Sequence, residues 1–161
     1  MNRTLLFLIL IIASFIVFPS CNSSKRTSNK VGKVKKSKSK TGGVQFVESK
    51  TLTAVLEQAE RENKLVFVDF YTTWCTPCKM MDQDVFPDRN IGTFFKKNFL
   101  SYKVNAEKGN GVNLAVVYNV SAYPTLLFLN EKGRVLESKQ GAAYQTELMA
   151  MANRALANRG N

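Results

Sequence analysis

Two cysteines separated by two residues are the side chains in this sequence best suited to chemistry. Cys75 and Cys78 stand in the stretch WCTPCK (residues 74–79), directly after a run of apolar residues. A dithiol that cycles with its disulfide needs one exposed thiolate and a nearby thiol that resolves the mixed disulfide. Cysteines at positions i and i+3 of a first helical turn meet both needs. We therefore interpret Cys75 as the attacking sulfur and Cys78 as the resolving, shielded one.

The predicted position of this pair favours reactivity. The motif follows a predicted buried strand and opens a predicted helix, where the helix dipole and free backbone N–H groups stabilise negative charge on Cys75. Such surroundings lower a cysteine pKa from about 8.5 to roughly 3.5–7.5. Pro77 has no N–H to leave unpaired in the first turn, and its fixed φ suits helix initiation. A structural disulfide and half of a zinc site are the alternative readings of a CxxC pair.

Two absences narrow the chemistry. The chain has no histidine, and its one other cysteine is Cys21. Ser-His and Cys-His catalysis and His-metal sites are therefore excluded. Two thiolates cannot complete a structural zinc site, which takes four protein ligands. We predict neither a metal nor an organic cofactor.

The elements that must position the motif form one predicted α/β domain, residues 44–161. Leu65–Tyr71 is a near-continuous apolar run, typical of a central strand buried on both faces, and Thr125–Leu129 is a second strand that pairs with a hairpin partner. The other predicted strands are residues 44–47, 100–104 and 135–137, and the predicted helices are residues 51–63, 76–85, 90–98, 112–118 and 145–158. This order predicts a central mixed β-sheet with helices on both faces.

Asp69 is the acidic residue inside the predicted central strand. An unpaired carboxylate is costly in apolar surroundings, and burial should raise its pKa and suit it to acid–base work. A purely structural role for Asp69 is the alternative.

Residues 1–21 have the pattern of a secretory signal. A basic residue precedes the apolar run Leu5–Phe18, which is shorter than the roughly 20 residues of a transmembrane helix. The stretch FPSC (residues 18–21) resembles the lipobox of bacterial lipoproteins, although Phe18 replaces the usual aliphatic residue. The resemblance implies lipidation at Cys21 and a membrane-anchored, extracytoplasmic (periplasmic) protein. An ordinary signal peptide and an uncleaved anchor are the alternatives.

The net charge of +11 is concentrated outside the predicted domain. Nine of the 23 Lys and Arg precede Val44 and no acidic residue comes before Glu48, which leaves 14 basic and 12 acidic side chains in the remainder. Residues 22–43 form a basic Ser/Lys linker with too little apolar content to offset its ordering entropy, so we expect disorder there. Contact of its lysines with anionic lipid is an alternative. We predict no nucleic-acid partner.

The stretch VDFYTTWCTPCK (residues 68–79) resembles the active site of the thioredoxin superfamily, and the resemblance extends over nearly all of residues 44–161. VFPD (residues 85–88) is similar to the C-terminal domain of the bacterial thiol–disulfide interchange protein. YPT (residues 123–125) resembles the family's cis-proline loop, and Gly141 its glycine after the hairpin. The resemblance implies a thioredoxin-like fold.

The resemblance also implies roles for individual residues. Pro124, if cis, faces the cysteines and leaves the backbone of Tyr123 free to pair with an extended substrate segment. Asp69 relays the proton of Cys78, and Lys103 lies near that acid. An ordinary trans proline and a merely solvated Lys103 are the alternatives.

Several residues around the motif bear on substrate choice and on the packing of the site. Trp74 is implied to border the substrate groove, with a packing role as the alternative. Thr76 and Pro77 stand where thioredoxins have Gly-Pro, and Tyr123 stands where many have an aliphatic residue or Thr. Tyr71 stands at a position where thioredoxins often have Trp. These departures leave the direction of electron flow open.

The predicted activity is reduction of disulfide-bearing protein substrates by a membrane-tethered thiol–disulfide oxidoreductase. Its electron donor is expected to be a membrane thiol–disulfide carrier, and its membrane contact the N-terminal lipid. A disulfide oxidase or isomerase on the same residues is one alternative. A binding module with a thioredoxin fold and a structural disulfide is another.

Overall fold

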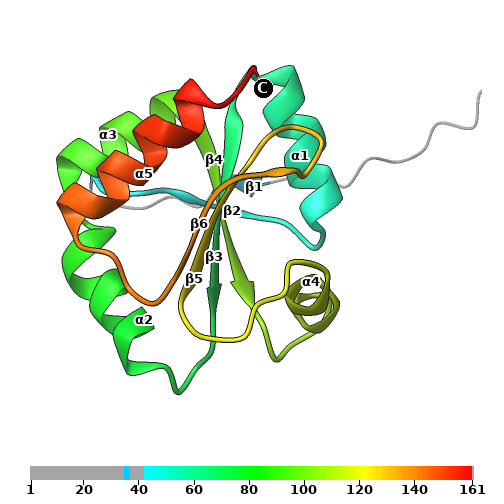
Figure 1. Ribbon diagram of the computed structural model, residues 1–161, viewed down its shortest axis with the longest axis vertical. Coiled ribbons are helices and arrows are strands. Elements are labelled where there is room, and N and C mark those ends of the chain that lie inside the picture. Colours follow the sequence, from blue (N-terminus) through cyan, green and yellow to red (C-terminus); the bar gives the residue numbers. More distant parts are fainter. Residues whose placement is uncertain (1–34, 37–41, 161) are drawn as a thin grey trace, which may run out of the picture. The chain divides into compact units, whose positions relative to one another are not determined.

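The computed structural model describes residues 35–36 and 42–160, which form a mixed six-stranded sheet with helices on both faces (Figure 1). The predicted signal segment, Cys21 and most of the predicted linker lie outside the described residues. The strands follow the order β1-β2-β4-β3-β5-β6 across the sheet. Their bounds are β1 Lys35–Lys36, β2 Phe46–Glu48, β3 Leu65–Tyr71, β4 Phe99–Asn105, β5 Thr125–Leu129 and β6 Val135–Gln140. The predicted α/β fold class is confirmed.

Strand β3 lies at the centre of the sheet and leads to the cysteine motif. It is parallel to β4 from Leu65, opposite Phe99, to Tyr71, opposite Asn105, and it is antiparallel to β5. Every residue of β3 except Tyr71 is buried, because helices cover both of its faces. The bounds of β3 and β5 are those predicted from their apolar runs.

The helices divide between the two faces of the sheet, as Figure 1 shows. Helices α1 and α4 pack on one face, and α2, α3, α5 and the π-helical turn η1 lie on the other, where apolar side chains of η1, α3 and α5 pack against the sheet. Their bounds are α1 Leu52–Arg61, α2 Thr76–Met80, η1 Met81–Val85, α3 Arg89–Asn98, α4 Gly111–Val117 and α5 Gln145–Ala157. No helix in the described part of the chain is long and apolar enough to cross a membrane.

Three local features differ from the predicted elements. The predicted helix after the motif changes at Met81 into η1, whose wider turn keeps both Met81 and Val85 fully buried. Strand β6 continues past Glu137, since an edge strand can pair its backbone while polar side chains face solvent. Within the segment expected to be disordered, Lys35–Lys36 pair antiparallel with β2, because backbone pairing needs no apolar side chain.

The start of the domain packs closely against α3 at a seat formed by Gly42, Gly43 and Gly92. A Cβ on Gly92 would lie 2.2 Å from the carbonyl oxygen of Gly42 and 2.5 Å from the Cα of Gly43. A Cβ on Gly43 would lie 2.2 Å from the carbonyl oxygen of Phe86. The amide of Val44 then donates to that same carbonyl at 2.7 Å. Only residues without a side chain fit these backbone contacts.

Candidate functional site

The cysteine pair lies where β3 ends and α2 begins. Cys75 is the N-cap residue of α2, and a disulfide joins it to Cys78 with the two Cα atoms 5.3 Å apart. The backbone N–H of Cys78 donates to Cys75 Sγ at 3.1 Å. The amide of Cys75 donates to the carbonyl of Thr72 at 3.4 Å, which ties the motif to the end of the strand. Cys75 Sγ therefore lies at a helix N-terminus with a backbone donor directed at it.

Both cysteines are buried in the disulfide. Cys75 is 2% exposed and Cys78 is 3% exposed, so the oxidised pair does not show the difference in exposure that we expected. A disulfide brings each sulfur against the other, which removes part of the surface that a free thiol at Cys75 would present. Thr76 and Pro77, in the first turn of α2, are both exposed.

Asp69 is a buried acid with an unusual pKa. Its residue is 1% exposed, and burial raises its carboxyl pKa from 3.8 to about 6. The Lys103 ammonium, 3.4 Å from Asp69 Oδ2, opposes this shift, and the carboxylate of Asp82 adds to it. Asp69 Oδ1 has no hydrogen-bond partner in the described structure. A pKa near neutrality suits this carboxylate to take and return a proton.

Lys103 lies between two carboxylates and three aromatic rings. The β3–β4 register places it directly opposite Asp69, and its Nζ also pairs closely with Asp82 Oδ1. The same Nζ lies 4.9 Å from the ring centroid of Tyr71 and 5.3–5.4 Å from those of Phe46 and Phe86. Cation–π attraction and two ion pairs thus hold the ammonium next to the buried acid.

Asp82 is a site residue that sequence reasoning missed. It belongs to η1 and its side chain is 45% exposed. The available signal is its spacing, because it follows Cys78 by four residues and therefore lies on the same helix face. Through Lys103 it connects the buried carboxyl of Asp69 to the protein surface.

An aromatic pair, of which Trp74 is exposed and Tyr123 half-buried, lies beside the cysteine motif. Trp74 is 64% exposed, and its indole N–H donates to Glu107 Oε1 at 2.9 Å. The rings of Trp74 and Tyr123 meet edge to face with centroids 5.9 Å apart. Glu107 is also a residue that sequence reasoning missed, since nothing in the sequence links it to a tryptophan 33 positions earlier.

The Tyr123–Pro124 peptide bond is cis. Tyr123 is half-buried, and neither its amide nor its carbonyl has a backbone partner among the described residues. The carbonyl of Pro124 accepts from the amide of Gly141 at 2.7 Å. Pro124 is thus held by the residue that follows β6, whereas the backbone of Tyr123 is available to pair with another chain.

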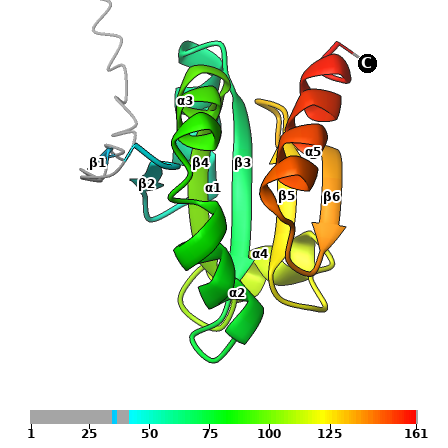
Figure 2. The same cartoon turned by 90° about the vertical axis from the view of Figure 1, so that its left-hand side faces the viewer.

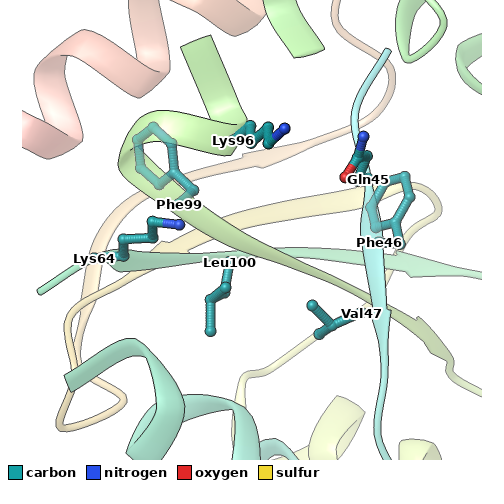
Figure 3. Close-up of a pocket in the computed structure, with 7 residues that line it drawn as sticks. All are labelled: Gln45, Phe46, Val47, Lys64, Lys96, Phe99 and Leu100. Atoms are coloured by element: carbon teal, nitrogen blue, oxygen red, sulfur yellow. The ribbon is translucent and has the colours of Figure 1, made fainter. Parts of the chain in front are cut away.

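A cavity elsewhere in the domain shares Phe46 with the surroundings of Lys103 but contains none of the other site residues. It is a small hollow, open to solvent, near the first residues of β4 (Figure 3). The cysteines lie at the other end of the sheet. The residues that line this cavity are Gln45, Phe46, Val47, Lys64, Lys96, Phe99 and Leu100. No group of three or more Cys, Asp or Glu side chains in the described residues is arranged to hold a metal ion.

Comparison with known proteins supports the same interpretation. The Thioredoxin family model matches residues 43–154. A thioredoxin of Mycoplasmoides gallisepticum is 31% identical over 101 residues, which cover 61% of this chain and 91% of that protein. Thioredoxin H4 of Arabidopsis thaliana is 32% identical over 90 residues, which cover 56% of this chain and 71% of that protein.

The solved structures include a similar bacterial protein. A candidate disulphide isomerase from Bacteroides thetaiotaomicron is 40% identical, with a TM-score of 0.65, and the match covers 73% of this chain and 97% of that one. The residues that the family model matches, 43–154, contain the disulfide pair, the buried acid and the cis-proline loop described above. This chain therefore belongs to the thioredoxin family and is a thioredoxin-like disulfide oxidoreductase.

Proposed function

We propose that this chain reduces disulfide bonds in proteins, with Cys75 as the attacking sulfur and Cys78 as the resolving one. The observation that carries this proposal is a disulfide-forming pair at a helix N-terminus, at the end of a strand that contains an acid of pKa about 6. The exposed Trp74 and the available backbone of Tyr123 support binding of an extended substrate segment beside the pair.

The reaction proceeds in two thiol–disulfide exchange steps. In the reduced protein, the Cys78 amide that donates to Cys75 Sγ stabilises the Cys75 thiolate. This thiolate attacks one sulfur of the substrate disulfide, forms a mixed disulfide and expels the other substrate sulfur as a thiolate. The carboxylate of Asp69 takes the proton of Cys78, whose sulfur attacks Cys75 and releases the second substrate thiolate. Two electrons pass to the substrate, and the Cys75–Cys78 disulfide remains.

Renewal of the dithiol requires a donor of two electrons and two protons. We assign this role to a membrane thiol–disulfide carrier outside the cytoplasm. The lipobox-like stretch that ends at Cys21 supports the tethered location. Mass spectrometry of the chain extracted from membranes tests the tether, because the mature protein should begin at an acylated Cys21 and Cys21→Ser should lose the acyl mass. A membrane-extracted chain that still carries residues 1–20, or that begins at Cys21 without acyl chains, would contradict lipidation at this residue.

Reduction of insulin disulfides by the purified chain, with dithiothreitol as donor, tests the assigned roles. Cys75→Ser should abolish the reaction, because it removes the attacking sulfur. Cys78→Ser should accumulate a mixed disulfide between Cys75 and the substrate. Insulin reduction at the parent rate by Cys75→Ser would overturn the proposal.

Disulfide isomerisation is the second candidate function, favoured by the description of the Bacteroides thetaiotaomicron relative. The reduction potential of the pair, equilibrated against glutathione, discriminates between the directions of reaction. A value near −270 mV, about that of thioredoxin, supports reduction, whereas a value near −180 mV, about that of protein disulfide isomerase, supports isomerisation. A value near about −120 mV would instead indicate an oxidant.

A further inference from the structure

Helix α4 presents an apolar face to solvent at the same end of the sheet as the cysteine motif. Its exposed residues are Val112 at 47%, Val116 at 73% and Val117 at 69%, together with the polar Asn113. The opposite side of the helix already packs on the domain through Gly111 and Ala115, which are buried. Valine is a poor helix former, and solvent-facing helix positions are usually polar. Three exposed valines within two turns therefore need an explanation other than the fold.

The stretch that contains these valines has no charged residue, although Glu107 and Lys108, just before it, are exposed. No Asp, Glu, Lys or Arg occurs from Gly109 to Asn130, in a chain of which 22% of the residues are charged. The exposed residues of this stretch outside α4 are likewise small or uncharged, and include Asn119, Ser121 and Ala122. Over Val116, Val117 and the residues that follow to Ala122, a charged partner would lose its hydration and gain no ion pair from this stretch.

Both ends of α4 connect to the aromatic pair that borders the disulfide. The loop before α4 carries Glu107, which holds the indole of Trp74. The loop after α4 leads to Tyr123, which packs against the same core cluster as Leu114 of the helix. Figure 2 shows α4 and the start of α2 at the same end of the sheet. The loops at the two ends of α4 therefore include Glu107, which holds Trp74, and Tyr123, so this helix lies next to the cysteine motif.

We propose that the exposed face of α4, defined by Val112, Val116 and Val117, is a docking surface for protein substrates whose chain beside the disulfide is apolar and uncharged. The inference rests on the proposed function and extends it to substrate class. The substrate cysteine reaches Cys75 past Trp74 and Tyr123, and its apolar flank covers α4. A small disulfide such as oxidised glutathione reacts at Cys75 without reaching α4.

The test compares the full chain, in detergent solution, with Val116→Thr/Val117→Thr, which keeps side-chain shape and adds polarity. The matched control is Val135→Thr, because Val135 is 42% exposed on β6 and pairs with Leu129, at the end of β5 away from Pro124. The probes are oxidised glutathione and two disulfide peptides of equal length. One peptide has Leu, Val and Phe around its cysteines, and the other has Lys, Glu and Ser.

The parent chain should reduce the apolar peptide with a higher kcat/KM than the charged one. The double variant should lose about five-fold in kcat/KM toward the apolar peptide, since the apolar area that it buries falls. Its kcat/KM for oxidised glutathione should not change, and Val135→Thr should match the parent chain throughout. Equal rates of the parent on both peptides, or an equal loss on glutathione, would overturn the docking surface.

Two further measurements separate the possible failures. An apolar peptide with Ser in place of its cysteines should bind the parent chain more tightly than the double variant, by calorimetry, whatever the redox activity is. If the parent reduces none of the three disulfides but binds this peptide, the proposed function fails and the docking surface stands. A parent dimer that the double variant converts to a monomer would show that a second copy covers α4, and would overturn the proposal.

Discussion

The side chains around Asp69 combine two opposing electrostatic effects on one carboxyl group. Burial disfavours its charged form, whereas Lys103 at 3.4 Å favours it. Burial is the larger effect, so the pKa rises to about 6. At pH 7 this buried carboxyl group is therefore mostly charged, and its charge lowers the stability of the folded protein.

Replacement of Asp69 by a neutral residue should raise the free energy of unfolding, and the increase should depend on pH. The folded pKa, about 6, lies above the usual 3.8, so the folded state binds more protons between these values and stability falls as pH rises through them. Asp69→Asn should match the parent near pH 4 and exceed its free energy of unfolding by about 3 kcal/mol near pH 7. Urea unfolding of both proteins from pH 4 to pH 8 measures the difference. A difference that does not vary with pH would contradict this account.

The negative charge of Asp82 should raise the pH at which Asp69 takes up a proton. Removal of its charge eliminates a repulsion and leaves Lys103 to pair with Asp69 alone, and both changes lower the Asp69 pKa. Asp82→Asn should therefore shift the acidic limb of the pH profile of kcat for insulin reduction to lower pH. Asp84→Asn is the control, because Asp84 is exposed on the same turn. Identical profiles for both variants would exclude this role.

At the scale of elements, the loops that follow the neighbouring parallel strands β3 and β4 are joined by one hydrogen bond between side chains. The indole of Trp74, before α2, donates to Glu107, before α4. The bond fixes an exposed ring that would otherwise rotate freely, and the edge-to-face contact with Tyr123 depends on the same ring orientation.

Loss of the acceptor should affect substrate binding more than the chemical step. Glu107→Ala should raise KM for insulin about two- to five-fold with little change in kcat, which corresponds to a hydrogen bond of ordinary strength. Glu107→Gln keeps an acceptor oxygen and should restore most of the binding. Glu60→Ala, an exposed carboxylate on α1, should change neither constant. A fall in kcat without a change in KM would contradict a positioning role.

Strong local patterns in the sequence predicted most of the elements. Apolar runs fixed the bounds of β3 and β5, and the CxxC spacing identified the disulfide. The π-turn η1 was not predicted, because one wider turn leaves the helical spacing of apolar residues nearly unchanged. Contacts such as Trp74 with Glu107 depend on how β4 and α4 come together, which no local pattern records.

At the scale of the whole domain, the seat formed by Gly42, Gly43 and Gly92 joins the beginning of the described chain to α3. A methyl group at Gly92 would overlap backbone atoms of both other glycines, at 2.2–2.5 Å. Backbone atoms cannot move away as the end of a flexible side chain can, so the packing between the first segment and the helix must open.

Gly92→Ala should therefore destabilise the domain by roughly 2–4 kcal/mol, in the range of overpacked buried positions. Thermal unfolding followed by circular dichroism measures the loss as a lower Tm. Gly160→Ala is the control, since a Cβ at Gly160 meets no atom within 4 Å. Equal Tm values for the two variants would show that the backbone contacts around Gly92 accommodate a methyl group without loss of stability.

The position of Trp74 gives the molecule a built-in optical reporter. It is the single tryptophan of the chain, it is largely exposed, and it is adjacent in sequence to Cys75. Disulfides quench indole fluorescence at short range, and desolvation shifts its emission to the blue. One wavelength scan of the unlabelled protein can thus follow both the oxidation state of the pair and the arrival of a partner, in the same cuvette and on the timescale of a single turnover.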